Sequence, residues 1–271
     1  MKKLLVLLAL VAASGAHAAN VVNGSPLYKP AENHFYSETN LATRSNDVNA
    51  YTLSENMYYG ITDRVTVGAS IVASEEDAFK EAQWNVIAAN VSYRFVNDMN
   101  WKVDAIASYG LNNLWSRVAP KSHSLLDKEN TTYTWMGGAR IGYETSQGAV
   151  ALHANYAYTN TESFNWGNGE FGAYTPNHVL NIGVDAQYIL NNCWNVVAGA
   201  DYYGFMGRGA WEKNIGFWEL KAGVNYNIDA TKYVGAYVSK TIAHADETPE
   251  HSGNWKGTDG IGMGIKFGID F

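Results

Sequence analysis

The chain has little cysteine, few prolines and no long hydrophobic run, and each shortage excludes something. Cys193 is the only cysteine in 271 residues, so no internal disulfide can hold the fold. After Ala18 no apolar run approaches the roughly 18 residues of a membrane-spanning helix, which excludes a helical membrane protein. None of the five prolines falls inside the segments that we predict below as strands.

The charges and short motifs also exclude several kinds of partner. Lysine and arginine number 19 against 26 acidic residues, so the chain lacks the basic excess of a nucleic-acid-binding protein. The histidines are scattered, and the acidic residues at positions 75–81 lack the spacing of a calcium loop. No glycine-rich phosphate motif precedes a helix. We therefore expect no cofactor, no metal site and no nucleic-acid partner.

The N-terminus has the pattern of a cleavable secretory signal. Two lysines precede the apolar run from Leu4 to Ala13, which ends in small residues up to Ala18. The run is too short to anchor the chain as a membrane helix. We predict that residues 1–18 are removed and that the mature chain begins at Ala19.

Most of the remaining chain alternates between apolar and polar residues with a period of two. In the segment 217–228 the apolar face carries Trp218, Leu220, Ala222, Val224, Tyr226 and Ile228, and the other face carries Glu219, Lys221, Gly223, Asn225 and Asn227. A strand separates these two sets, whereas a helix would mix them. The same pattern recurs from residue 65 to the C-terminus, so each predicted strand has one apolar and one polar face.

The breaks between these segments alternate between short and long. Short breaks fall at 61–64, 97–100, 146–148, 191–193 and 229–232, and long ones at about 75–81, 113–130, 161–177, 206–216 and 244–257, with a shorter one near 43–47. This pattern predicts an all-β, transmembrane, antiparallel up-and-down barrel of twelve strands, with short periplasmic turns, longer extracellular loops and both termini in the periplasm. Glu38, Glu55 and Lys240 interrupt the alternation. A barrel of ten strands therefore remains an alternative to twelve.

Aromatic residues recur near both ends of the predicted strands, as they do at the two boundaries of a membrane. Those beside the short turns are Tyr59, Tyr93, Phe95, Trp101, Tyr143, Tyr188, Trp194, Tyr226 and Tyr233. Those toward the long loops are Tyr109, Trp115, Tyr133, Trp135, Tyr156, Tyr158, Tyr202 and Trp218. We expect two girdles of rings facing lipid.

The C-terminal segment alternates between apolar residues and glycines and ends in phenylalanine, with Ile265, Phe267, Ile269 and Phe271 on the apolar face. It resembles the terminal strand of the bacterial outer-membrane β-barrel (porin-like) superfamily. The resemblance implies a barrel over residues 33–271, a periplasmic segment at 19–32, and contact with outer-membrane lipid and lipopolysaccharide. It also implies that these four residues are the signal read by the barrel-assembly machinery.

The polar faces of the strands define a predicted lumen. Its wall would carry Arg94, Lys102, Asp104, Arg140, Glu144, His153, Asn155, Asp185, Asp201, Glu219, Lys221 and Lys266. Twelve strands leave a passage about 12 Å wide once inward side chains are subtracted. Opposed charges, inward-folded loops or residues 19–32 would narrow it.

Three functions fit this reading. The leading hypothesis is a non-enzymatic channel for small hydrophilic solutes, with Asp201, Glu219 and Lys221 as a constriction. The second is a non-conducting barrel that acts through its loops. The third is a membrane-embedded hydrolase, for which the nearest candidate is His153 with Asn155; a serine nucleophile is missing beside them, and both would face the lumen.

Overall fold

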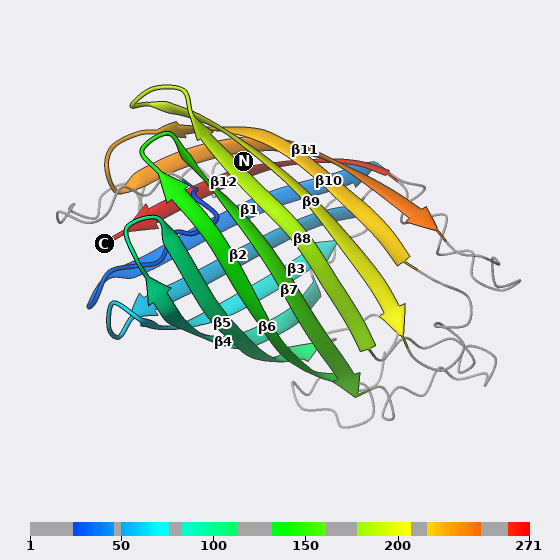
Figure 1. The fold of residues 1–271 in the computed structure, drawn as a ribbon. Helices are drawn as coiled ribbons and strands as arrows, with labels where there is room; N and C mark the ends of the chain where they lie inside the picture. The colour runs from blue at the N-terminus through cyan, green and yellow to red at the C-terminus, as the bar shows by residue number, and fades with distance from the viewer. Residues whose placement is uncertain are drawn as a thin grey trace, which may run out of the picture.

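The computed structural model describes residues 24–45, 50–75, 83–112, 132–160, 178–206, 216–244 and 260–271. The predicted signal sequence, Trp115 and most of the long loops lie outside these residues. In the described part, twelve antiparallel strands close into one barrel (Figure 1). They are β1 (Phe35–Ser45), β2 (Ala50–Gly60), β3 (Val65–Glu75), β4 (Gln83–Asn97), β5 (Trp101–Asn112), β6 (Thr132–Thr145), β7 (Gly148–Asn160), β8 (His178–Ile189), β9 (Trp194–Met206), β10 (Gly216–Asn227), β11 (Lys232–His244) and β12 (Gly260–Asp270).

The barrel closes because the first strand pairs with the last. Tyr36 lies opposite Asp270 and Ser45 opposite Ile261, so β1 and β12 are paired along almost their whole length. Every other strand pairs with its two neighbours in the sequence. The prediction of twelve strands is confirmed. Among the described residues there is no helix with the length and apolar character needed to cross a membrane.

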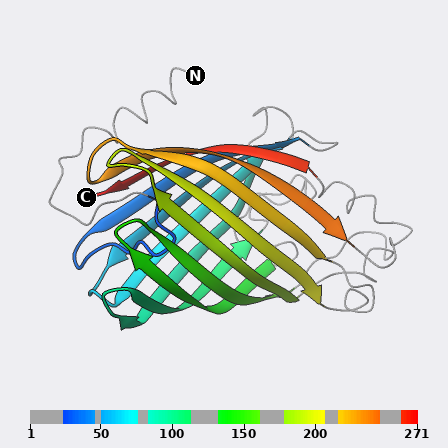
Figure 2. The ribbon, with the colours of Figure 1, turned by 45° about the horizontal axis from the view of Figure 1, so that its top comes forward.

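The five predicted short turns are confirmed at 61–64, 98–100, 146–147, 190–193 and 228–231, all at one end of the barrel (Figure 2). Polar side chains close three of them: Thr62, Asn191 and Asp229 each accept hydrogen bonds from backbone N–H groups two or three residues later. The C-terminus lies at this same end, where the backbones of Phe35 and Phe271 bond to each other.

The two faces of the wall are inverted relative to a soluble protein. Large apolar side chains point outward and are exposed, as with Leu152 at 56% and Ile265 at 52%. Buried polar and charged residues outnumber buried apolar ones in the described part and point inward, Asp104 and Asp201 among them. This distribution is the one expected when lipid surrounds the barrel.

The three residues that interrupt the sequence pattern lie on different faces. Glu38 points inward, whereas the cross-strand register places Glu55 and Lys240 on the outward face. The Glu55 carboxylate accepts hydrogen bonds from the hydroxyls of Ser37 and Thr39 on the neighbouring strand. These bonds compensate part of the cost of an outward-facing charge.

One predicted girdle residue is wrong. Tyr233 is 1% exposed and faces the interior, where its hydroxyl bonds to Glu38. It lies next to a short turn, as the pattern required, but Lys232 begins β11 on the outward face, so the alternation turns the next side chain inward.

We predict that the double variant Ser37→Ala/Thr39→Val is less stable than the wild type by about 1–3 kcal/mol, because it leaves an outward-facing carboxylate without donors. Urea unfolding of the barrel in lipid vesicles measures the change. Thr43→Val, a change on the same strand face but away from Glu55, serves as the control. Equal unfolding midpoints in all three proteins would contradict the prediction.

Candidate functional site

The inward faces of the strands enclose a cavity of about 530 Å³. Four of the predicted lumen residues line it, namely Arg140, Asp185, Lys221 and Lys266. The other contributors are largely polar or aromatic, including Glu38, Asn40, Asn90, Tyr58 and Tyr237. A cavity of this size lies within the range of small-molecule sites in proteins.

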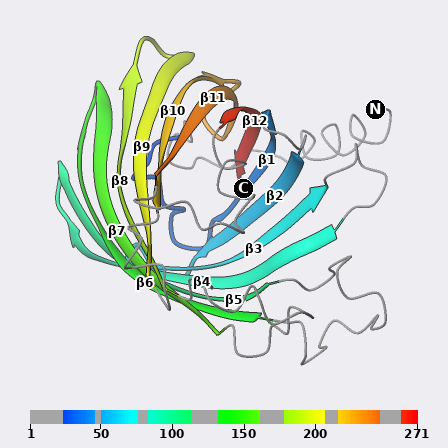
Figure 3. The same ribbon diagram turned by 90° about the vertical axis from the view of Figure 1, so that its right-hand side faces the viewer.

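The N-terminal segment, residues 24–34, forms one boundary of this cavity. It lies inside the ring of strands, at the end where the short turns lie (Figure 3). Gly24 lies beside Asn225 on β10 and Tyr233 on β11, and Leu27 packs with Ala149 and Ala151 on β7, three strands further round the ring. The segment therefore crosses the barrel. It ends at His34, whose Nδ1 lies 3.0 Å from the Asp270 carboxylate.

Leu27 fits against the wall because position 142 is glycine. A Cβ atom at Gly142 would lie 2.4 Å from a methyl carbon of Leu27. Leu27 itself is only 2% exposed. An alanine at position 142 would displace the side chain that seats the segment.

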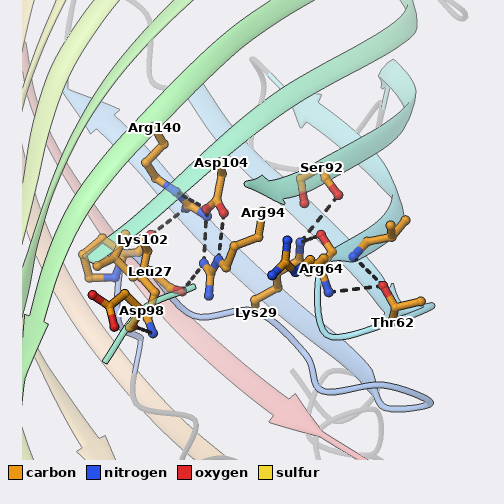
Figure 4. Close-up of polar contacts among 12 residues, drawn as sticks. Leu27, Lys29, Thr62, Arg64, Ser92, Arg94, Asp98, Lys102, Asp104 and Arg140 are labelled. Carbon is orange, nitrogen blue, oxygen red and sulfur yellow. Dashed lines mark hydrogen bonds and ion pairs between the residues drawn. The ribbon is translucent and has the colours of Figure 1, made fainter. Parts of the chain in front are cut away.

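Three charged side chains on neighbouring strands hold the segment in place (Figure 4). Arg94, Asp104 and Arg140 face each other across β4, β5 and β6. Arg94 donates from Nε to Oδ1 of Asp104 at 2.7 Å and from Nη2 to Oδ2 at 3.1 Å. Arg140 donates from Nη2 to Oδ2 at 2.6 Å and from Nε at 3.1 Å. Asp104 is 1% exposed, so its charge depends on both partners.

This cluster carries two cations and one anion, and the N-terminal segment supplies further acceptors. Arg94 donates to the carbonyl oxygen of Leu27 at 2.9 Å, and Arg140 donates to that of Pro26 at 2.6 Å. A register shift in β4 directly after Arg94 marks a β-bulge, a feature that re-aims neighbouring side chains.

Lys29 is a third cation, next to this cluster, and it is buried. Its ammonium donates to the carbonyl oxygens of Arg64 and Ser92. The pKa of Lys29 falls from 10.5 to about 8, mainly because of burial; Asp104 opposes the shift, and Arg94 and Arg140 add to it. The docked segment therefore releases this proton more easily than a segment in water.

A second cluster lies across β7 to β10. Nε2 of His153 lies 2.8 Å from Oδ1 of Asp201, and its Nδ1 lies 3.4 Å from Asp185. Lys221 lies 3.1 Å from Glu219 and 3.8 Å from Asp201. The three residues expected at a constriction are therefore in contact, and the structure adds the histidine to them.

His153 reaches across a whole strand because Gly183 on β8 has no side chain. A Cβ atom there would lie 2.3 Å from the Asp201 carboxylate and 2.6 Å from the His153 ring. Asn181 on the same strand donates to Asp201 at 3.1 Å and accepts from Asn155 at 3.0 Å.

A third cluster was not predicted from the sequence. Glu38 on β1 accepts hydrogen bonds from the hydroxyls of Tyr36, at 2.9 Å, and of Tyr233. Tyr28, from the N-terminal segment, packs against Tyr36 with ring centroids 4.9 Å apart. The sequence did contain a signal for this cluster, because Tyr36, Glu38 and Asn40 alternate along one face of the strand. The charge of Glu38 instead looks like an interruption of the pattern.

The remaining predicted lumen residues are more scattered. Lys102 donates to the carbonyl oxygen of Asp98 in a turn at 2.6 Å. Glu144 is partly exposed near the same end, and its backbone carbonyl accepts from Asn100 at 2.8 Å. Lys266 lies over the ring of Tyr237, with 5.4 Å from Nζ to the centroid.

Among the predicted assembly residues, Ile265 is exposed on the outward face, whereas Ile269 is 1% exposed. Phe271 packs against Phe35 with ring centroids 5.1 Å apart. Their role in assembly stays a prediction.

The described residues contain no group of three or more histidine, cysteine or acidic side chains arranged to hold a metal ion. Both ring nitrogens of His153 face carboxylates, an arrangement that differs from a serine–histidine pair.

No protein-family model matches the sequence, and the search of curated proteins found no match. Solved structures are similar in fold. The NanC porin has a TM-score of 0.58 and 12% identity, over 86% of this chain and 98% of that one. An outer membrane channel from Pseudomonas putida F1 has a TM-score of 0.58 and 10% identity, over 92% and 100%. The KdgM porin has a TM-score of 0.52 and 7% identity, over 86% and 99%.

The chain therefore has the fold of the outer-membrane porins. This confirms the barrel fold that the strand pattern and the resemblance implied. At identities of 12% and below, the likeness establishes the architecture alone.

We predict that Asp104→Asn costs about 3–5 kcal/mol of stability, because two buried arginines lose their counter-charge. Residues 24–30 should also be held less firmly, so single-channel conductance in planar bilayers should rise. Asp63→Asn, in an exposed turn, is the control. An unchanged unfolding midpoint and conductance for Asp104→Asn would show that this carboxylate does not anchor the segment.

The lowered pKa of Lys29 predicts a pH dependence. Below pH 8 the ammonium is charged whether the segment is docked or free, and docking bears the full cost of burying it. Between pH 8 and 10.5 the docked lysine is neutral while the free one keeps its proton, so docking becomes more favourable as pH rises. Conductance should fall from pH 7 to pH 9.5, and Lys29→Met should weaken this change. An equal fall in the variant would assign the effect to other groups.

Proposed function

We propose that this protein is an outer-membrane channel for the passive diffusion of small hydrophilic solutes, narrowed at one end by its own N-terminal segment. The observation that carries the proposal is the polar cavity of about 530 Å³ inside a closed barrel with apolar outer faces. Such a wall isolates an aqueous path from lipid. The porin names of the structural neighbours support the same function.

The charges of the lumen would set a mild preference among ions. Arg94, Arg140 and Lys29 against Asp104 leave two positive charges near the N-terminal segment at neutral pH. The group of Asp185, Asp201, Glu219 and Lys221 leaves negative charge on the other wall. The fields of opposed charges that lie within about one Debye length of each other, roughly 8 Å at physiological salt, partly cancel, and salt screens those farther apart.

The proposal includes a location and an orientation. The short turns and both termini would lie in the periplasm, with outer-membrane lipid and lipopolysaccharide around the barrel. The C-terminal strand, with Phe267 and Phe271 on its outward face, would be the part that the barrel-assembly machinery recognises.

A second candidate is a non-conducting barrel that acts through its loops. The crossing of the lumen by residues 24–34 favours it, because a tightly held segment could close the path. We do not propose catalysis, since His153 is engaged with two carboxylates.

Planar-bilayer recordings test the proposal. The wild-type barrel should give discrete conductance steps with mild cation preference. Asp201→Asn/Glu219→Gln should shift the reversal potential toward anions, because both carboxylates face the lumen. Glu55→Gln, the same kind of change on the outward face, should leave it unchanged. If repeated insertions of wild-type protein give no conductance above background, the channel proposal is wrong and the non-conducting barrel takes its place.

A further inference from the structure

Glu38 is an inward-facing carboxylate without a cationic partner among the described residues. None of the salt bridges among the described residues includes Glu38, which is held instead by the hydroxyls of Tyr36 and Tyr233. Neutral donors stabilise a carboxylate but leave its negative charge in place. Glu38 also lines the cavity, so this charge is open to a solute.

Four tyrosines lie near this carboxylate, two that bond to it through their hydroxyls and two that pack on the Tyr36 ring. Tyr28, Tyr36, Tyr58 and Tyr233 all line the same cavity. Tyr36 packs between Tyr28, at 4.9 Å, and Tyr58, at 6.3 Å between centroids. We call Glu38 and these four tyrosines the tyrosine–Glu38 cluster. The carboxylate attracts a cation by its charge, and the partly exposed rings of Tyr28 and Tyr58, which line the same cavity, add the attraction of the ring quadrupole.

The wall next to this cluster already holds an ammonium group of the protein. Lys266 projects from β12 two residues before Gly268, which lies opposite Glu38. Its Nζ lies over the ring of Tyr237, 5.4 Å from the centroid, rather than in an ion pair with Glu38. The contact between Lys266 and the Tyr237 ring is of the kind that a cationic solute would make with a tyrosine. The ammonium of Lys266 would also repel such a solute from Glu38.

We propose that the tyrosine–Glu38 cluster is a binding site for a small organic cation, an ammonium group with apolar substituents. Methyl or methylene groups on the nitrogen suit aromatic faces, and the charge suits the carboxylate. A metal ion fits less well, because it requires several oxygen ligands and Glu38 is the only carboxylate of the cluster. An anion or a neutral solute would leave the charge of Glu38 uncompensated.

The proposal deepens the channel function, since the site lines the same cavity. The N-terminal segment completes the site through Tyr28, so a cation bound there would contact the element that narrows the path.

Calorimetric titration of the purified full-length barrel in detergent with choline chloride, against sodium chloride at equal ionic strength, tests the site. Wild-type protein should bind choline in preference to sodium. Glu38→Gln should weaken choline binding about tenfold, because it removes the charge but keeps an oxygen for the tyrosine hydroxyls. Lys266→Met should strengthen it several-fold by removing the competing ammonium. Glu55→Gln, on the outward face, should leave it unchanged.

The outcomes separate this inference from the channel proposal. Choline binding without conductance would support the site and overturn the channel. Conductance with no choline binding, or binding that Glu38→Gln leaves unchanged, would overturn the site and keep the channel. A preference for a neutral polyol over choline, measured in the same way, would also overturn it.

Discussion

The pairing of β1 with β12 is the constraint on which the rest of the structure depends. In lipid an unpaired backbone N–H or C=O group costs several kcal/mol, so a sheet can cross a membrane only if it has no free edge. The ladder from Tyr36 opposite Asp270 to Ser45 opposite Ile261 removes the last edge. Once the ring is closed, the two-residue alternation of every strand assigns each side chain either to lipid or to the interior.

The closed ring also explains why charge gathers inside. An inward side chain can be paired with a neighbour one or two strands away, because inward residues on adjacent strands are a few ångströms apart. Arg94, Asp104 and Arg140 use direct cross-strand positions, whereas His153 passes over Gly183 to reach Asp201. Outward charges have fewer options, and the hydroxyls of Ser37 and Thr39 are the local solution for Glu55.

The alternation of residues predicted the strand count, the turns and the inward charges, since all three follow from local periodicity. It misjudged Tyr233 and left Glu55 open, because residue type was weighed against alternation: a tyrosine beside a turn faces inward, and a glutamate stands on the apolar face. The tyrosine–Glu38 cluster is built from β1, β2, β11 and the N-terminal segment, so no single stretch of sequence contains it. The course of residues 24–34 through the barrel could not be predicted either, because an irregular segment has no periodic pattern of apolar residues.

That segment links two of the three polar clusters, the one around Asp104 and the one around Glu38. Its carbonyl groups take the spare donors of Arg94 and Arg140, Lys29 places a buried ammonium beside them, and Tyr28 packs on the ring that bonds Glu38. None of these contacts is covalent, and the only large apolar anchor among them is Leu27. The free energy of docking residues 24–34 against the wall comes mainly from charged and polar contacts. It therefore changes when the charges in the cavity change. A solute cation near Glu38 would contact the same segment that Arg94 and Arg140 hold. Binding of a solute in the cavity and the width of the path beside residues 24–34 would therefore be coupled through this segment.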